Sequence, residues 1–68
     1  MAKRVVEVWT DTRVFEFLQP EWAEDIVLHW HANSLWVEAV ANGRIDTMGF
    51  FPMTNIRAVV RKEAVADA

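Results

Sequence analysis

The chain has 68 residues, of which 53% are apolar and 25% charged, and its formal net charge is −3. This length allows one small domain, whose stability is limited by the core area it can bury. The sequence contains no cysteine, which excludes a disulfide framework, a cysteine zinc site and a thiol nucleophile, and we expect a reducing, cytoplasmic setting. Glu7 and Asp11 interrupt the first apolar run, so it predicts neither a signal peptide nor a membrane span.

The first 18 residues predict a β-hairpin. Residues 4–9 alternate, with Val6 and Val8 on one face and Val5, Glu7 and Trp9 on the other. Asp11-Thr12 provides a turn, and residues 13–18 then continue as a second strand. Its alternating aromatic positions are Phe15 and Phe17.

Residues 20–32 fit two periods. A helix would begin near Pro20, which suits a first turn, and would carry acidic residues close to its N-terminus. A strand starting near Asp25 would instead alternate strictly and pack three residues inside: Ile26, Leu28 and Trp30. We favour the strand because its alternation is complete and aromatic residues favour strands. The alternative is an α+β fold with one helix at residues 20–32 against an antiparallel sheet.

Two further strands are predicted to follow a turn at Asn33-Ser34. The first has Leu35, Val37 and Ala39 on one face, and Trp36, Glu38 and Val40 on the other. Asn42-Gly43 is a strong signal for a tight hairpin, because both residues tolerate a positive φ. The next strand is expected to run from Arg44 towards Phe51.

The stretch GFFPMTNI, residues 49–56, predicts a corner. Gly49 permits a bend or a close backbone approach, and Phe50 and Phe51 should point to opposite faces. Pro52 cannot donate to a strand ladder, so the strand should end there. Residues 53–56 can then make one tight turn before RAVVR, residues 57–61, resumes as the last strand.

Five or six short strands with regularly spaced turns predict an all-β, closed or nearly closed antiparallel barrel. Residues 35–60 resemble the second half of a Src-homology-3 type barrel, with Trp36 before Ala39, the Asn42-Gly43 hairpin and the Gly-x-x-Pro of residues 49–52. Asn55 occupies the place of a ligand-contacting tyrosine in that family, so the resemblance implies the barrel topology rather than polyproline recognition. The strand-rich, acidic outline also resembles small bacteriophage proteins. We expect a single domain at residues 1–62 and a flexible tail at residues 63–68.

The sequence offers little for catalysis or metal binding. His29 and His31 would share one strand face, but no third ligand has a spacing that predicts convergence. There is no glycine-rich nucleophile elbow and no phosphate loop, and the sequence has only two glycines. We therefore expect a protein that is not an enzyme and has neither metal nor cofactor.

Four tryptophans are more than so small a core readily buries, and aromatic residues left on a surface are typical of interface hot spots. We expect a non-catalytic protein–protein interaction module, in one version a phage-encoded binder or inhibitor of a host protein. A self-assembling structural subunit is the alternative, and binding to a membrane is not expected. The candidate binding residues are Trp9, Trp36, Glu38, Phe51, Pro52 and Asn55.

A small barrel that binds nucleic acid is a further alternative. It would use Arg4, Arg13, Arg57 and Arg61 for phosphates. The acidic net charge and the scattered cations argue against it, because tight binding needs clustered positive charge.

Overall fold

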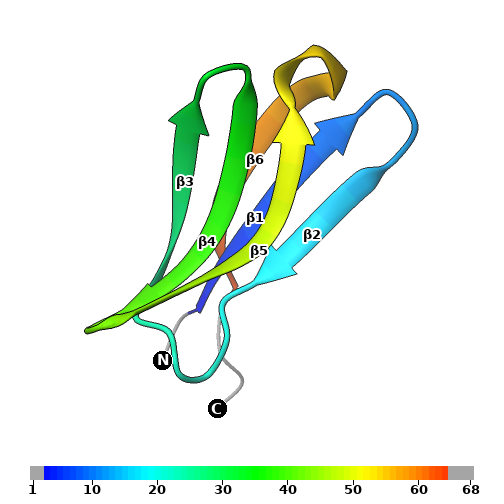
Figure 1. The fold of residues 1–68 in the computed structure, drawn as a ribbon. Helices are drawn as coiled ribbons and strands as arrows, with labels where there is room; N and C mark the ends of the chain where they lie inside the picture. The colour runs from blue at the N-terminus through cyan, green and yellow to red at the C-terminus, as the bar shows by residue number, and fades with distance from the viewer. Residues whose placement is uncertain (1–2, 65–68) are drawn as a thin grey trace.

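The computed structural model describes residues 3–64, which are built almost entirely from antiparallel strands (Figure 1). The all-β prediction is confirmed, and the six strands found in these residues fall within the predicted number. One 3₁₀ turn, η1, precedes the last strand. The elements are β1 (Lys3–Thr10), β2 (Val14–Leu18), β3 (Asp25–His31), β4 (Ser34–Ala41), β5 (Arg44–Pro52), η1 (Met53–Asn55) and β6 (Ile56–Ala64).

The strands form two three-stranded sheets. Sheet A has the order β2-β1-β6, and sheet B has the order β3-β4-β5. The central strand of each sheet shows the predicted alternation: Val6 and Val8 of β1 are fully buried, as are Leu35, Val37 and Ala39 of β4. Because successive side chains in a strand point to opposite faces, each sheet has one inner face on the core and one outer face.

The core lies between the two inner faces. Phe51 of β5 packs edge-on against Phe15 and Phe17 of β2, with ring centroids 5.1 and 5.9 Å apart. Ile26 of β3 is fully buried in the same cluster. Phe15 and Phe17 therefore lie on the inner face of β2, and their rings join β2 of sheet A to β5 of sheet B.

The ambiguous segment contains strand β3, so the strand prediction is confirmed and the helix alternative is wrong. Residues 20–24 form the turn that leads into β3, and the Glu24 N–H donates to the Val40 carbonyl over 2.8 Å. This bond attaches the turn to β4. A helix could not place Asp25–His31 beside β4 in the observed ladder, which pairs Asp25 with Val40 and His31 with Ser34.

One prediction for this segment is wrong. Trp30 was expected to pack inside with Ile26 and Leu28, but it is 52% exposed. Burial decreases along the inner face of β3, from Ile26 through the half-buried Leu28 to Trp30. The reason is that β3 is an edge strand whose carboxyl end diverges from that of β1 (Figure 1).

The GFFP corner has the predicted form. Phe51 is buried and Phe50 is 50% exposed, so the two rings face opposite sides of β5. A Cβ atom added to Gly49 would lie 2.6 Å from Cζ of Phe17, so only glycine lets the Phe17 ring approach β5 this closely. β5 ends at Pro52, and η1 provides the single tight turn before β6.

A β-bulge in the β4–β5 ladder was not predicted. Val37 pairs with Gly49, whereas Glu38 pairs with Thr47, so Met48 is an extra residue on β5. The bulge reverses the alternation of β5, which puts Ile45 on the outer face with 66% exposure.

The barrel was predicted to be closed or nearly closed, and it is not closed, because no strand pairing joins the two sheets within residues 3–64. Along the β3 side, Arg61 Nη2 donates to the Ile26 carbonyl over 3.1 Å, and Arg4 Nε lies 3.1 Å from Asp25 Oδ1. These contacts connect the sheets through side chains. Along the β2–β5 side the Phe15 and Phe17 rings contact the Phe51 ring, and a groove between the two strands leaves this side open.

Strand β6 extends to Ala64, two residues past the predicted domain boundary at residue 62. Its end pairs with the start of β1, where Arg4 lies opposite Glu63. The rest of the predicted tail, residues 65–68, lies outside the described residues.

Candidate functional site

The six candidate binding residues are distributed over three places. Trp36, Glu38 and Pro52 lie on the outer face of sheet B, where Pro52 pairs with Ser34. Phe51 and Asn55 line a groove between β2 and β5. Trp9 lies on the outer face of sheet A, on the opposite side of the core. The fold therefore presents separate surfaces rather than one combined site.

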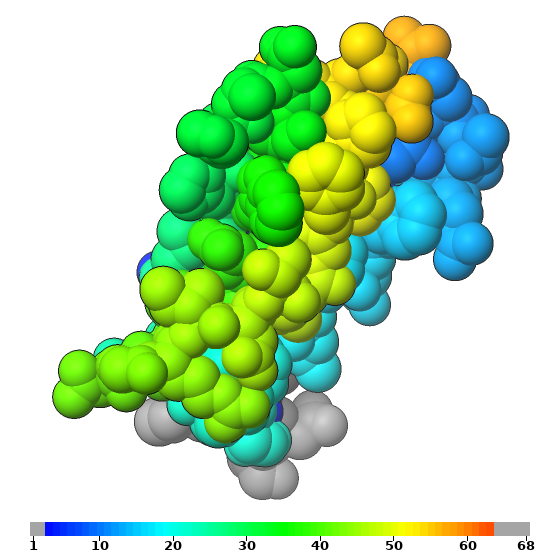
Figure 2. Space-filling model, viewed as in Figure 1, coloured from blue at the N-terminus to red at the C-terminus, as the bar shows by residue number. Residues whose placement is uncertain are grey.

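The outer face of sheet B, which is turned toward the viewer in Figure 2, carries the aromatic side chains of Trp36 and Phe50. Trp36 and its cross-strand partner Phe50 pack edge-on with ring centroids 4.7 Å apart. Exposed aliphatic side chains extend the surface in both directions, with Val27 38% and Ile45 66% exposed. We call this surface the Trp36 face and define it as Val27, His29, His31, Trp36, Glu38, Val40, Ile45 and Phe50.

Within the Trp36 face, four side chains enclose a shallow pocket of about 300 Å³: His29, His31, Trp36 and Glu38. The ladder places His29 directly opposite Trp36. The carboxylate Oε1 of Glu38 lies 3.7 Å from Nδ1 of His29, and its side chain is 20% exposed. The pocket therefore combines an indole, a carboxylate and two imidazoles.

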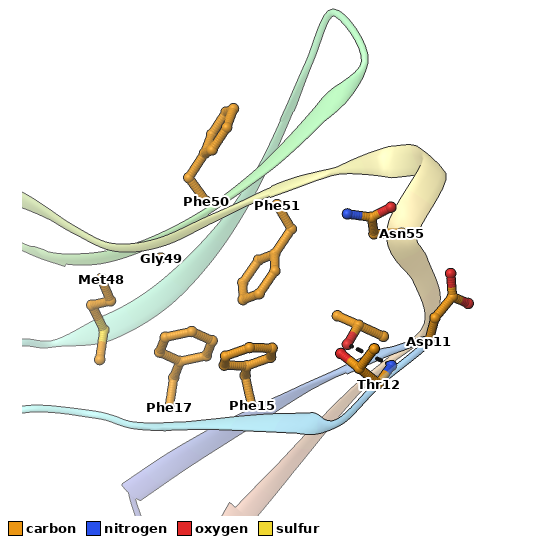
Figure 3. A pocket seen from close by; sticks show the side chains of 10 residues that line it. Asp11, Thr12, Phe15, Phe17, Met48, Gly49, Phe50, Phe51 and Asn55 are labelled. Atoms are coloured by element: carbon orange, nitrogen blue, oxygen red, sulfur yellow. Dashed lines mark hydrogen bonds between the residues drawn. The ribbon is translucent and has the colours of Figure 1, made fainter.

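A larger groove of about 560 Å³ lies along the open β2–β5 side. Figure 3 shows Phe15, Phe17 and Phe51 converging in it, while Phe50 points to the other side of β5. Asn55 of η1 lies at one end, beside the turn that carries Asp11 and Thr12. The groove has an apolar floor and one polar end, as binding sites for small or extended ligands commonly do.

The outer face of sheet A has its own tryptophan. Trp9 is 45% exposed, and its indole N–H donates to Glu7 Oε1 over 3.2 Å. The ammonium of Lys62 lies 2.9 Å from the other oxygen of Glu7. The hydrogen bond from Lys62, followed by that from Trp9, lowers the pKa of Glu7, and the same contact with Glu7 raises the pKa of Lys62. This carboxylate therefore already has a cation from its own chain.

The four arginines proposed for phosphate binding all contact groups of this chain. Arg4 pairs with Asp25, and Arg57 pairs with Asp11. Arg61 reaches Asp25 and the Ile26 carbonyl, while the Arg13 guanidinium lies 4.5 Å above the Phe15 ring. Arg4 and Arg61 line one small pocket with Lys62, but neither Arg13 nor Arg57 lines it. The four arginines therefore do not make the continuous cationic track that nucleic-acid backbones require.

In the described part of the chain, no group of three or more histidine, cysteine, aspartate or glutamate side chains is arranged to hold a metal ion. His29 and His31 are neighbours, with ring centroids 6.0 Å apart. Among residues 3–64 there is also no helix of the length and apolarity needed to cross a membrane.

The sequence-based candidates missed three parts of these surfaces. Phe50 was recognised as facing away from Phe51 but was not assigned to the site with Trp36. Val27 follows from the alternation of β3, so its outer position was available in the sequence. The outer position of Ile45 could not be predicted from the sequence, because strict alternation from Phe51 places Ile45 on the inner face and the bulge moves it to the outer face.

Three comparisons were made, with models of protein families, with curated proteins and with solved structures, and none of them found a match to this chain.

Proposed function

We propose that the protein is a non-catalytic protein–protein interaction module that binds through the Trp36 face. The observation that carries this proposal is the edge-on Trp36–Phe50 pair, in which Trp36 is half-buried and Phe50 is 50% exposed, beside the exposed Val27 and Ile45. Aromatic side chains at the centre of an apolar surface are the usual energetic core of an interface, because they bury a large area with few rotatable bonds. Trp36 lies on the central strand β4, which fixes its position before binding and so reduces the entropic cost.

The resemblance of residues 35–60 to a Src-homology-3 type barrel supports the same class of function, since such small barrels serve as binding modules. The outline shared with small bacteriophage proteins supports one version of the proposal, in which the chain is a phage-encoded binder or inhibitor of a host protein. A self-assembling subunit would use the same surface with a second copy as its partner. The engaged arginines weigh against the nucleic-acid alternative.

The test compares two tryptophan variants on opposite faces. Trp36→Thr should abolish partner capture or self-association, whereas Trp9→Thr, which changes the same residue type on sheet A, should retain it. Threonine keeps the strand preference of both positions. Light scattering over a concentration series separates self-association from capture of another protein. Equal capture and equal solution mass for the wild type and both folded variants would overturn the proposal.

A further inference from the structure

We propose that the pocket formed by Trp36 and Glu38 binds a lysine or arginine side chain of a protein partner. This inference rests on the proposed function and names the chemistry that the partner brings. The carboxylate of Glu38 is the centre of the argument. Among residues 3–64, its only basic neighbour within 4.0 Å is the His29 imidazole, at 3.7 Å, and no lysine or arginine pairs with it.

The other sheet of the same molecule shows how an equivalent pair is completed. Glu7 and Trp9 are two residues apart on β1, the central strand of sheet A, and both face outward. Trp36 and Glu38 have the same separation on β4, the central strand of sheet B. In sheet A the carboxylate receives the Lys62 ammonium at 2.9 Å, whereas sheet B supplies no such cation.

The charges around the pocket favour a cation over other ligands. The outer face of sheet B carries two carboxylates, of Asp25 and Glu38, and Asp25 is already paired with Arg4. Glu38 is therefore the carboxylate left for an incoming cation. The Glu38 side chain is only 20% exposed. A charge-assisted hydrogen bond to a carboxylate covered in this way is stronger than one made in open solvent.

The surroundings of Glu38 also suit the rest of a basic side chain. The indole of Trp36 lines the pocket beside Glu38, where a cation could contact its ring. This chain makes such a contact elsewhere, with the Arg44 guanidinium 3.8 Å from the Trp22 ring centroid. Val27, directly opposite Glu38 in the ladder, and Phe50 provide apolar surface for the methylene stem of a lysine or arginine.

The experiment is a nuclear magnetic resonance titration of the full chain, which follows the indole N–H signal of Trp36. The probes are the Nα-acetyl methylamides of lysine, arginine and norleucine, where norleucine has a similar stem without the charge. The titration is run near pH 8, where an ordinary imidazole is neutral. We expect saturable shifts with the lysine and arginine probes, and at least five-fold weaker binding of the norleucine probe.

Two isosteric variants with the same change in net charge complete the test. Glu38→Gln should weaken binding of the lysine probe at least five-fold, whereas Glu24→Gln, outside the pocket, should leave it unchanged. Equal binding of norleucine and lysine would overturn the inference while leaving the Trp36 face as an apolar interface. Absence of any shift at Trp36 would also overturn it.

A Trp36 signal that depends on protein concentration alone would show that a second copy occupies the pocket, which likewise overturns the inference. These outcomes are distinct from failure of the proposed function. If Trp36→Thr abolishes capture of a partner but Glu38→Gln does not, the Trp36 face is still an interaction surface, but the proposed binding of a basic side chain at Glu38 is wrong.

Discussion

Replacing Gly49 with alanine tests whether close packing of the Phe17 ring on β5 holds the open side of the fold together. A Cβ atom there would lie 2.6 Å from Phe17 Cζ and 2.9 Å from Cε1, whereas carbon atoms in ordinary contact are about 3.5–4.0 Å apart. The ring would have to move by roughly 1 Å. It cannot do so freely, because the Phe51 ring packs against it.

The magnitude follows from two opposing effects. Overpacking of this kind costs about 1–3 kcal/mol, and replacing a strand glycine with alanine recovers roughly 0.5–1 kcal/mol of backbone entropy. We expect Gly49→Ala to lower the free energy of unfolding by about 1–2 kcal/mol. For a slope of about 1 kcal/mol per molar urea, the midpoint falls by about 1–2 M, which fluorescence or circular dichroism readily detects.

A double-mutant cycle identifies the cause. Phe17→Leu removes the two ring atoms that the new Cβ would meet, so Gly49→Ala combined with Phe17→Leu should be less destabilised than the sum of the single variants by about 1–2 kcal/mol. Gly43→Ala is the control, because Gly43 has a φ of 76° and nothing within 4 Å of an added Cβ. Its cost comes from the backbone and should add to that of Phe17→Leu. Additivity of Gly49→Ala with Phe17→Leu, or a Gly49→Ala variant as stable as the wild type, would refute the reasoning.

Two further predictions concern register and charge. Ile26→Ala should lower the free energy of unfolding by about 2–5 kcal/mol in urea titrations, because Ile26 is fully buried. Val27→Thr on the outer face should change this free energy by less than about 0.5 kcal/mol. Similar losses in the two variants would contradict the register of β3. Lys62→Gln should destabilise the protein at neutral pH, because the contact with Glu7 lowers the pKa of Glu7 and raises that of Lys62. The urea midpoints of wild type and variant should converge as the pH falls below 4.5, through the lowered pKa of Glu7, and again as it rises above 10.5, through the raised pKa of Lys62. A difference that persists down to about pH 2 would exclude the ion pair as its source.

The positions of most strands and turns could be predicted, because local sequence signals agree with the fold. The Asn42-Gly43 turn, the alternation of Leu35 and Val37, and the Pro52 stop each depend on residues close together in the chain. Trp30 could not be placed by the same means. Its alternation is correct, but its burial depends on how far the two sheets diverge, which is a property of the whole assembly.

The composition of the Trp36 face was only partly predictable for a related reason. Trp36 and Glu38 follow from the period of β4. The bulge at Met48, which brings Ile45 onto the same face, depends on how β5 pairs with β4 and on the room that Gly49 gives to Phe17. No local pattern in residues 44–51 indicates where the extra residue is accommodated.

The two outward Trp–Glu pairs show how far a shared sequence pattern determines the contacts that a carboxylate makes. Both pairs have a two-residue spacing on a central strand, so the sequence ranks Trp9 and Trp36 alike. Register decides between them, because the pairing of Val5 with Lys62 brings an ammonium diagonally to Glu7, whereas the pairing of Glu38 with Val27 brings only a histidine near its carboxylate. Glu7 is therefore paired with a lysine of its own sheet, whereas no lysine or arginine among residues 3–64 pairs with Glu38, and the proposed contact with a partner rests on this difference. A surface assigned by residue type alone would have included both.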